Sequence, residues 1–515
     1  MGSDYKTAKE EWVADLTGST ILHVNLLSLV ALCSIALYSA LASRIYRARM
    51  IPFPAMWAIL VLPLLLSMTV FANSPTFLSF LLLVPTTLLL LMIPRQVPET
   101  PLPSPNPMSP TSRQPNPPYE PKAQIPPLPS VTVYRAHMLL MTILAILAVD
   151  FPVFPRSLAK CETFGVSLMD LGVGSFVFSQ GLVSAIPLLK DPSYLSAPAG
   201  PKILSVARKA LPIILIGLVR VLLVKGTEYP EHESEYGTHW NFFITLALLP
   251  ILQVMLHPAI KRIPLALLAI LVALAQQLTL SFLGMHDFVL KAPRTGLISA
   301  NKEGIVSLPG YLAIHLLGLS AGTVILPPSP KYFSRSLKGR ARRNSNPNDK
   351  RNTLAAPREN DHTAIELCSY TIIWWSLLGL SMSFKIGGKE VSRRMANLPY
   401  VLWIAAFNTS FILGYLLLDI YFFPSRSVYS QKSKLKVPVE IAIDHPSRQQ
   451  QMQSAPPLLE AFNKNGLVLF LVANVCTGLI NLTIPTMYTS DLQAMLILNY
   501  YGGRKKACTQ GLAVT

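Results

Sequence analysis

Long apolar runs recur along this chain, and they constrain its fold more than any other feature. A run of about 18 residues or more can cross ~30 Å of hydrocarbon as a helix, and only helices or closed barrels satisfy the backbone there. The composition agrees, because 14% of the 515 residues are charged and 51% are hydrophobic, whereas soluble domains carry roughly 25% charged residues. We therefore predict an all-α polytopic membrane protein with about 12 to 13 transmembrane helices.

The runs divide the chain into expected membrane spans. The predicted segments are 20–42, 54–72, 76–93, 136–150, 169–187, 203–224, 239–257, 264–283, 305–326, 366–386, 396–422 and 464–486. After Asp491 only about eleven apolar-leaning residues precede Gly502 and a basic tail, fewer than a span needs, so we expect a weakened last helix. The polar N-terminus lacks the basic start and cleavage site of a signal peptide, which indicates that the first run is retained.

The net charge of +18 is concentrated in the loops between the runs. Membrane orientation explains such charge, since basic loops stay in the cytosol, and a nucleic-acid partner is not needed. The N-terminus and the turn after Asp150 then face the opposite side. Stretches rich in proline, serine and charge at 94–130, 328–362 and 425–457 are typical of disordered loops. We assign these loops to the cytosol, within one integral-membrane domain that covers 1–515.

Signatures of soluble enzymes do not explain this chain. The sequence contains no HExxH, no paired CxxC and no Walker motif, and we expect no metal. Gly172 and Gly174 lie inside an apolar run, which indicates helix packing rather than a nucleotide-binding fingerprint. Any chemistry therefore belongs to polar groups at the ends of spans.

Ionisable residues gather where the fourth span ends. Asp150 closes an apolar run and precedes Phe151-Pro152, which disfavours helical geometry. Lys160 follows a Pro-x-x-Pro turn that can fold back and bring the two charges together. One interpretation is an interfacial salt bridge or a snorkelling lysine. The other is a base and a cation that tune each other's pKa, and charge in a membrane is by default a functional-site hypothesis.

Further polar clusters open the seventh and ninth spans. His239 and Asn241 are typical of an interfacial anchor with a helix cap, or else supply a base and a substrate hydrogen bond. The ninth span begins with a cation at a helix N-terminus, a pattern that favours anions, although a plain cap with an ion pair is the alternative. Its candidate residues are Lys302, Glu303, Tyr311 and His315.

Two more groups complete the candidates. Arginine suits phosphate, so Arg393, Arg394 and the nearby Asn397 either bind phosphate or anchor the chain at the membrane surface. Asparagines inside spans are costly unless paired, and they either bond neighbouring helices or line a cavity. These intramembrane residues are Asn408, Asn474 and Asn481.

Several long segments resemble the GPI inositol acyltransferases, the family of the fungal GPI-anchored wall transfer proteins and animal PIG-W. The main segment is VDFPVFPRSLAKCETFGVSLMDLGVGSFVFSQG (149–181). The others are KEEWVADLTGST (9–20), GTHWNFFITLALLP (237–250), NKEGIVSLPGYLAIHLLG (301–318), RRMANLPYVLWIAAFN (393–408) and NGLVLFLVANVCTGLINLTIPTMY (465–488). Together they cover nearly all of the chain outside the three loops.

The resemblance implies about thirteen helices in the endoplasmic reticulum membrane, around a cavity for lipid and acyl-CoA. It implies transfer of a fatty acyl group, typically palmitoyl, from acyl-CoA to the inositol 2-hydroxyl of glucosaminyl-phosphatidylinositol, without a bound cofactor. It also implies a target for antifungal inhibitors. The family's proposed catalytic aspartate and lysine correspond to Asp150 and Lys160.

On this basis we expect Asp150 to act as the base, with His239 as a rival base. Lys160 is expected to stabilise an oxyanion, orient Asp150 or neutralise the acceptor phosphate. Arg156 joins the substrate-binding candidates, whereas Asp170 is equally well a structural partner for Arg156 or Lys160. A secondary transporter of a lipid or anionic solute is the alternative, although the chain shows no internal repeat of the kind many transporters have; a scaffold subunit is a third reading.

Overall fold

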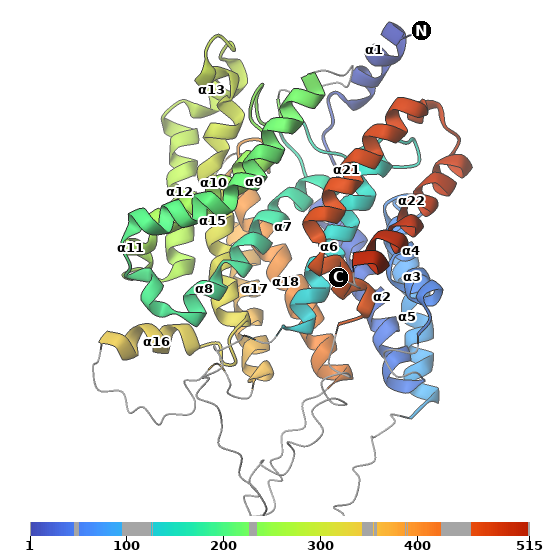
Figure 1. The fold of residues 1–515 in the computed structure, drawn as a ribbon, viewed down its shortest axis with the longest axis horizontal. Coiled ribbons are helices and arrows are strands. Elements are labelled where there is room, and N and C mark those ends of the chain that lie inside the picture. The colour runs from blue at the N-terminus through green and yellow to red at the C-terminus, as the bar shows by residue number, and fades with distance from the viewer. Residues whose placement is uncertain are drawn as a thin grey trace, which may run out of the picture.

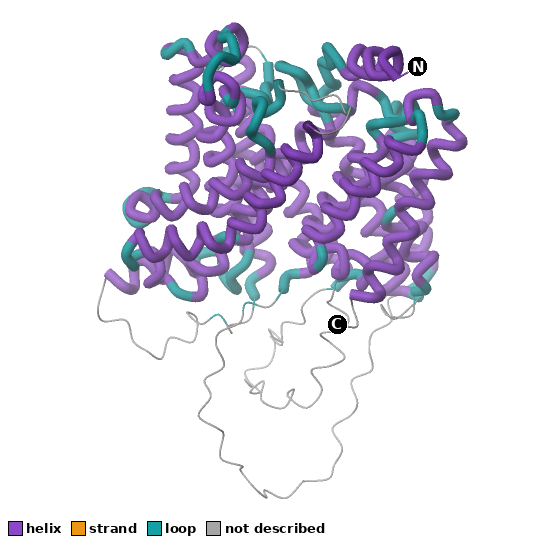
Figure 2. Tube along the Cα trace, turned by 45° about the horizontal axis from the view of Figure 1, so that its top comes forward, coloured by secondary structure: helices purple, strands orange, loops and turns teal. Residues whose placement is uncertain are grey.

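The structure is a computed structural model that describes residues 2–45, 51–94, 125, 127–225, 234–341, 354, 358–386, 388, 390–423 and 455–512. Within these ranges the regular elements are helices, and Figure 2 shows helices joined by loops. The prediction of an all-α polytopic membrane protein is confirmed.

The first half of the chain forms α1 Gly2–Val13, α2 Ile21–Arg44, α3 Phe53–Leu60, α4 Leu62–Ser67, α5 Pro75–Met92, α6 Pro129–Ala148, η1 Arg156–Leu158, α7 Leu168–Val183, α8 Ala185–Lys190, η2 Pro192–Leu195, α9 Ala199–Lys225, α10 Phe242–Met255 and α11 His257–Ile260. The second half forms α12 Leu265–Phe282, α13 Met285–Lys291, α14 Leu297–Ala300, α15 Lys302–Ile325, α16 Tyr332–Ala341, α17 Asn360–Ser383, α18 Leu398–Phe422, α20 Pro457–Lys464, α21 Gly466–Thr483, η5 Thr486–Tyr488 and α22 Asp491–Leu512.

Nine helical segments in the described ranges are long and apolar enough to cross a membrane. They are Ile21–Arg44, Pro75–Met92, Pro129–Ala148, Leu168–Lys190, Leu265–Phe282, Lys302–Ile325, Asn360–Ser383, Leu398–Phe422 and Gly466–Thr483. Two shorter apolar segments, Phe53–Ser67 and Phe242–Met255, fall where spans were also expected. The expected span 203–224 lies in α9, whose Arg208, Lys209 and Arg220 make it more charged than the nine.

Several expected boundaries were wrong. The span expected at 54–72 is broken into α3 and α4, and Pro63 stands at the start of α4, where a missing N–H is tolerated. Helix α6 begins at Pro129 rather than at residue 136, because proline suits the first turn of a helix. Residues 95–124 of the first predicted loop lie outside the described residues.

The prediction of disorder over 328–362 was wrong for its described parts. Helix α16 occupies Tyr332–Ala341, and Phe333 on it is buried. The guanidinium of Arg358 donates to the carbonyls of Ile325 and Leu326 at 2.7 and 3.0 Å, and so caps the C-terminus of α15 just before α17 begins at Asn360. Of the loop predicted at 425–457, residues 425–454 lie outside the described residues.

The last helix was expected to be a weakened span. Helix α22 runs without a break from Asp491 to Leu512 and passes through Gly502 and Gly503. A glycine in a helix costs only about 1 kcal/mol relative to alanine, and good helix formers on both sides can offset that. By composition α22 is not among the nine candidate spans.

Glycines let α7 and α15 cross closely in the centre of the bundle. A Cβ atom at Gly181 would lie 2.0 Å from the His315 carbonyl oxygen, and one at Gly318 would lie 2.0 Å from that of Phe178. Gly318-Leu-Ser-Ala-Gly322 has the spacing of a hydrolase nucleophile motif, but it lies within helix α15, and its glycines serve packing. Helix α15 is buried over most of its length and packs against α7, α10, α12 and α18.

The N-terminal helix α1 lies at one end of the bundle, which we call the α1 end (Figure 1). Residues 150–166, between α6 and α7, fold at the same end. Backbone hydrogen bonds join them to the N-terminal segment: Glu162 N donates to Leu16 O at 3.1 Å and Ser19 N to Val166 O at 2.6 Å. The segment 14–20 is thus fastened to the turn that carries the predicted catalytic residues.

Candidate active site

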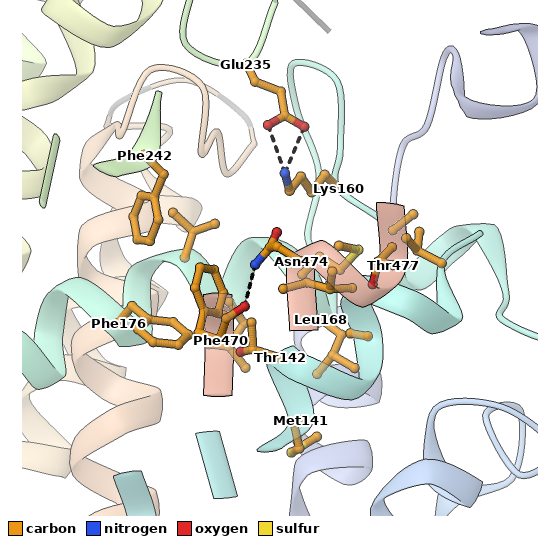
Figure 3. A pocket seen from close by; sticks show the side chains of 18 of the residues that line it. Met141, Thr142, Lys160, Leu168, Phe176, Glu235, Phe242, Phe470, Asn474 and Thr477 are labelled. Carbon is orange, nitrogen blue, oxygen red and sulfur yellow. Dashed lines mark hydrogen bonds and ion pairs between the residues drawn. The ribbon is translucent and has the colours of Figure 1, made fainter. Parts of the chain in front are cut away.

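A large cavity lies among α1, α2, α6, α7, α9, α10, α18 and α21. Its volume is about 1490 Å³, and most side chains along it are apolar. Among the described residues, charged side chains line only its α1 end. They are Lys9, Asp150, Arg156, Lys160, Glu162 and Glu235. Figure 3 shows Lys160 and Glu235 at one end of this wall and Met141 at the other.

Helix α6 gives the cavity its length. Tyr134, Met138, Met141, Ala145 and Val149 all line it, and their spacing of three or four residues places them on one face of the helix. From Tyr134 to Ala148 the helix rises roughly 20 Å. A long, narrow apolar ligand can therefore lie along α6.

Tyr134, His137 and Tyr415 line the cavity at its far end from α1. Together with Asn408, which contacts Tyr134, we call them the polar floor. The Tyr134 hydroxyl donates to Asn408 Oδ1 at 2.5 Å, and His137 Nδ1 lies 2.8 Å from the Tyr415 hydroxyl. Asn408 Nδ2 donates to the Ile404 carbonyl. These buried groups have partners in neighbouring helices, so Asn408 is an interhelical contact at the cavity floor.

Asp150 lies at the α1 end of the cavity, two residues after α6 ends, and is 4% exposed. Asn481 Nδ2 of α21 donates to its Oδ2 at 2.8 Å. The ammonium of Lys9 lies 3.3 Å from Oδ1 and donates to Asn481 Oδ1 at 2.8 Å. The carboxylate is therefore oriented by an amide and neutralised by a lysine that the sequence analysis did not select.

Lys160 lines the same cavity but pairs elsewhere. Its ammonium donates to both carboxylate oxygens of Glu235, at 2.8 and 3.0 Å (Figure 3). Asp150 and Lys160 line the same cavity. The expected pairing of these two charges was wrong, because each forms its ion pair with a different residue. The site thus holds two lysine–carboxylate pairs, Lys9–Asp150 and Lys160–Glu235.

Arg156 holds the turn between these two pairs. Its Nη2 donates to the carbonyls of Val149 and Phe154 at 2.6 and 3.1 Å, and the Trp12 ring lies 3.7 Å from its guanidinium carbon. Burial lowers the pKa of Arg156 to about 10, against the opposing effect of the Asp150 carboxylate. The side chain is therefore charged at neutral pH and fixes Asp150 at the end of α6.

Cys161 also lines the cavity, but the site keeps its thiol protonated. Burial raises its pKa well above the ordinary value, and the nearby Asp170 adds to the shift. A thiol is a poor nucleophile without ionisation. Cys161 is therefore unsuited to act as an acyl-carrying nucleophile.

Asp170 is structural, and its partner is Arg393 rather than Arg156 or Lys160. Arg393 Nε donates to its Oδ1 at 2.6 Å, while Cys161 N and Ser167 Oγ donate to Oδ2. Both charges are buried. Arg393, predicted as a phosphate ligand, therefore holds the 160–170 loop against the start of α18.

Glu303 forms a second structural ion pair. It is 0% exposed and accepts from Arg294 and Arg394, at 2.7 and 3.0 Å. Lys302 donates to the Ala292 carbonyl at 2.5 Å. The residues predicted to bind an anion at the start of α15 therefore form internal ion pairs and hydrogen bonds that join neighbouring loops. This is the alternative of a plain cap with an ion pair.

The remaining candidates hold backbone or other helices. Asn241 and Asn397 cap α10 and α18, and the Tyr311 hydroxyl donates to the Arg393 carbonyl. His315 Nε2 lies 2.7 Å from Gln253 Oε1 inside the bundle. His239 is exposed and its backbone N–H donates to Asn301. None of these five lines the cavity described above.

The candidates that line the cavity are Asp150, Arg156, Lys160, Asn474 and Asn481. Asn474 donates to the Phe470 carbonyl in its own helix (Figure 3). Sequence analysis missed Lys9 and Glu235, which lie in segments without membrane character. The KEEW segment that begins at Lys9 is part of the family resemblance, and it was the one sequence feature that could have pointed to Lys9. In the described residues no cluster of three or more His, Cys, Asp or Glu side chains could hold a metal ion.

Comparison with known proteins decides the family. The GWT1 family model matches residues 5–509. The chain belongs to the GWT1 family. It is similar to proteins named GPI-anchored wall transfer protein 1 from Gibberella zeae (38% identical, covering 99% of this chain and 97% of that one), Aspergillus oryzae (37%; 97% and 96%) and Cryptococcus neoformans var. grubii (36%; 97% of each). The GWT1 match spans α1 and α21, so it includes every element that lines the charged end of the cavity.

Proposed function

We propose that this protein transfers a fatty acyl group, typically palmitoyl, from acyl-CoA to the inositol 2-hydroxyl of glucosaminyl-phosphatidylinositol. Membership of the GWT1 family supports a role in GPI-anchor biosynthesis. One structural observation supports the acyl-transfer step: a buried, oriented Asp150 closes one end of a long apolar cavity.

The apolar part of the cavity suits the acyl chain of the donor. A lipid acyl chain fills about half of the ~30 Å hydrocarbon core, or roughly 15 Å, and α6 offers roughly 20 Å of cavity wall between Tyr134 and Ala148. With the chain along α6 and its end at the polar floor, the thioester lies near Asp150. The donor needs no further cofactor, since the thioester itself is reactive.

Asp150 acts as the general base. It takes the proton of the 2-hydroxyl while the hydroxyl oxygen bonds to the thioester carbonyl carbon. The C–S bond then breaks, and the CoA thiolate leaves and is protonated by Asp150. Asn481 keeps the carboxylate oriented throughout. A positioned base contributes typically about 10²- to 10⁴-fold in rate.

Lys160 stabilises the negative charge on the carbonyl oxygen in the transition state. It lines the same end of the cavity and is partly exposed, and Glu235 holds its ammonium. Charge placed where an oxyanion develops is worth about 10²- to 10³-fold in rate. His239, the rival base, is exposed and lies outside the cavity lining, so we assign it no catalytic role.

We place the enzyme in the endoplasmic reticulum membrane as a multi-pass protein. The basic loops favour a cytosolic position, which puts the α1 end and its charged cavity mouth on the lumenal side. The acceptor lipid then enters from the lumenal leaflet. Acyl-CoA, glucosaminyl-phosphatidylinositol and the bilayer are the partners this proposal requires.

The test is acyl transfer by purified protein in lipid nanodiscs with palmitoyl-CoA and glucosaminyl-phosphatidylinositol, followed by mass spectrometry of the product. We expect Asp150→Asn to lower kcat by about 10²-fold or more and Lys160→Ala by about 10²-fold. Retained transfer by both variants contradicts the site, and no transfer by folded wild type contradicts the function.

Matched controls come from an exposed ion pair on α13. Asp287 and Lys291 are 64% and 75% exposed and lie 3.1 Å apart. Asp287→Asn and Lys291→Ala remove the same groups far from the cavity lining, and both should retain wild-type transfer. His239→Ala should also retain it; a loss equal to that of Asp150→Asn would make His239 the base. Thermal melting confirms that each variant is folded.

A further inference from the structure

Lys9 stands in the cavity wall beside Asp150, and helix α1 is the element that puts it there. The residue is 6% exposed although it lies near the start of the chain. Its ammonium contacts Asp150 Oδ1 at 3.3 Å and Asn481 Oδ1 at 2.8 Å. Burying a lysine is costly unless its charge is used, and a helix that only covered the bundle would not need one at this position.

Arg156 supplies a second cation at the same wall. Its Nε and Nη1 groups are buried and have no hydrogen-bond partner in the described part of the chain. Buried donors of this kind are rare and call for an explanation. Lys9 and Arg156 together carry one positive charge more than the Asp150 carboxylate that they flank, although the six charged side chains at this end of the cavity balance. The two cations beside Asp150 can therefore contact an anion that binds there.

We infer that Lys9, with Arg156, binds the phosphodiester of the acceptor lipid; the inference rests on the proposed function. In a phosphatidylinositol the phosphate is attached to the ring carbon next to the one that bears the 2-hydroxyl. A cation that touches Asp150 is therefore in reach of the phosphate when the hydroxyl reaches the carboxylate. Helix α1 is thus part of the substrate site.

This arrangement gives Lys9 two partners in succession. Before the acceptor binds, its ammonium neutralises Asp150. When the phosphodiester arrives, Lys9 transfers its contact from Asp150 Oδ1 to a phosphate oxygen, and Oδ1 becomes available to accept the proton of the 2-hydroxyl. Asn481 keeps its bond to Oδ2. The base is thus exposed only when the correct anionic lipid is present.

The test compares the natural acceptor with an analogue whose phosphodiester is replaced by a neutral methylphosphonate. For wild type we expect the analogue to lower kcat/KM by about 10- to 100-fold, the usual effect of a hydrogen bond to a charged group. For Lys9→Met, which keeps the length of the side chain, the penalty of the analogue should fall by about 10-fold, and Arg156 accounts for the discrimination that remains. Lys9→Arg keeps the charge and should restore the discrimination. An equal penalty in wild type and Lys9→Met overturns the inference.

Acyl-CoA also carries phosphates that Lys9 could bind. A second acyl donor without phosphates distinguishes binding of CoA from binding of the acceptor lipid. Palmitoyl-pantetheine lacks the CoA phosphates, so the loss caused by Lys9→Met should be the same with either donor. If the loss disappears with palmitoyl-pantetheine, Lys9 serves CoA and the assignment is overturned. Lys291→Met, at an exposed lysine, should behave as wild type throughout. Absence of transfer by wild type to either acceptor contradicts the proposed function itself.

Discussion

The carboxylate of Asp170 is held by three donors although it is fully buried. Arg393 Nε, Cys161 N and Ser167 Oγ donate to it, and the Tyr400 hydroxyl donates to its backbone carbonyl. A buried ion pair of this kind contributes little beyond an apolar pair of the same size, but removing one partner leaves the other charge uncompensated. The pair therefore matters for stability rather than for chemistry.

We predict that Asp170→Asn is strongly destabilising, because it leaves Arg393 charged and buried. The expected cost is about 3 to 5 kcal/mol, which should lower the melting temperature in detergent by roughly 5 °C or more. Asp287→Asn removes an exposed carboxylate of an i,i+4 pair, and its melting temperature should match wild type within about 1 °C. Equal melting temperatures for the two variants would show that the Asp170–Arg393 ion pair does not stabilise the fold.

At the residue scale, sequence reasoning selected Asp150 and Lys160 of the candidate site for a physical reason. Asp150 and Lys160 stand out because charges at a span end are costly, and the proline turn indicated that they approach each other. Lys9 and Glu235 could not be found in this way, since each lies in a polar segment where a charge is ordinary. Their importance comes only from contacts made far along the chain, such as Lys9 with Asn481.

At the scale of elements, the α7–α15 crossing depends on glycine. Gly318 faces the Phe178 carbonyl so closely that a methyl group would lie 2.0 Å from its oxygen, and Gly322 faces Leu182 in the same way at 2.3 Å. In lipid, helices associate through packing rather than through the hydrophobic effect, so such contacts carry much of the stability. The helices must move apart if either glycine gains a side chain.

We predict that Gly318→Ala lowers the melting temperature and the yield of folded protein, by an overpacking cost of about 1 to 3 kcal/mol. Gly379→Ala on α17 is the matched control, because nothing lies within 4 Å of its added Cβ atom. That variant should be neutral or slightly stabilised by its better helix propensity. Thermal melting of both in one detergent checks the difference, and a stable Gly318→Ala would show that α7 and α15 can separate freely.

The positions of the helices were predictable where the chain crosses the membrane. Each expected apolar segment contains a helix, because a membrane-spanning backbone must bond within itself. The break between α3 and α4, the helix α16 and the length of α22 were not predictable from hydropathy. They depend on a proline at a helix start, on the burial of Phe333 and on helix propensity across Gly502, none of which changes the apolar count.

At the scale of the whole molecule, the cavity extends from a charged end to a polar floor. Its charged end lies at α1 and its polar floor at Tyr134, His137, Asn408 and Tyr415. Under the proposed function, the distance between them limits how long an acyl chain can extend while its thioester lies at Asp150. Chain-length preference should therefore reside in the cavity wall.

We predict that Met141→Trp, halfway along α6, shifts the preference from palmitoyl-CoA to a shorter donor such as decanoyl-CoA. Each methylene that no longer fits is worth about 1 to 3 kcal/mol, so the ratio of kcat/KM values should change by about 10-fold or more. A series of acyl-CoA donors measures it. Met255→Trp, at a residue that is 57% exposed on α10, should keep the wild-type profile; an unchanged profile for Met141→Trp would place the acyl chain elsewhere.

The contact of Asp150 with Lys9 and Asn481 also has a consequence for biosynthesis. Lys9 and Asn481 are 472 positions apart, so the ribosome makes Lys9 long before Asn481. A nascent chain can insert every helix up to α18 and still lack the amide that orients Asp150, because α21 has not yet been made. Under the proposed function, acyl transfer begins only after α21 has entered the membrane, and a chain that is terminated before α21 remains inert however well its earlier helices are packed.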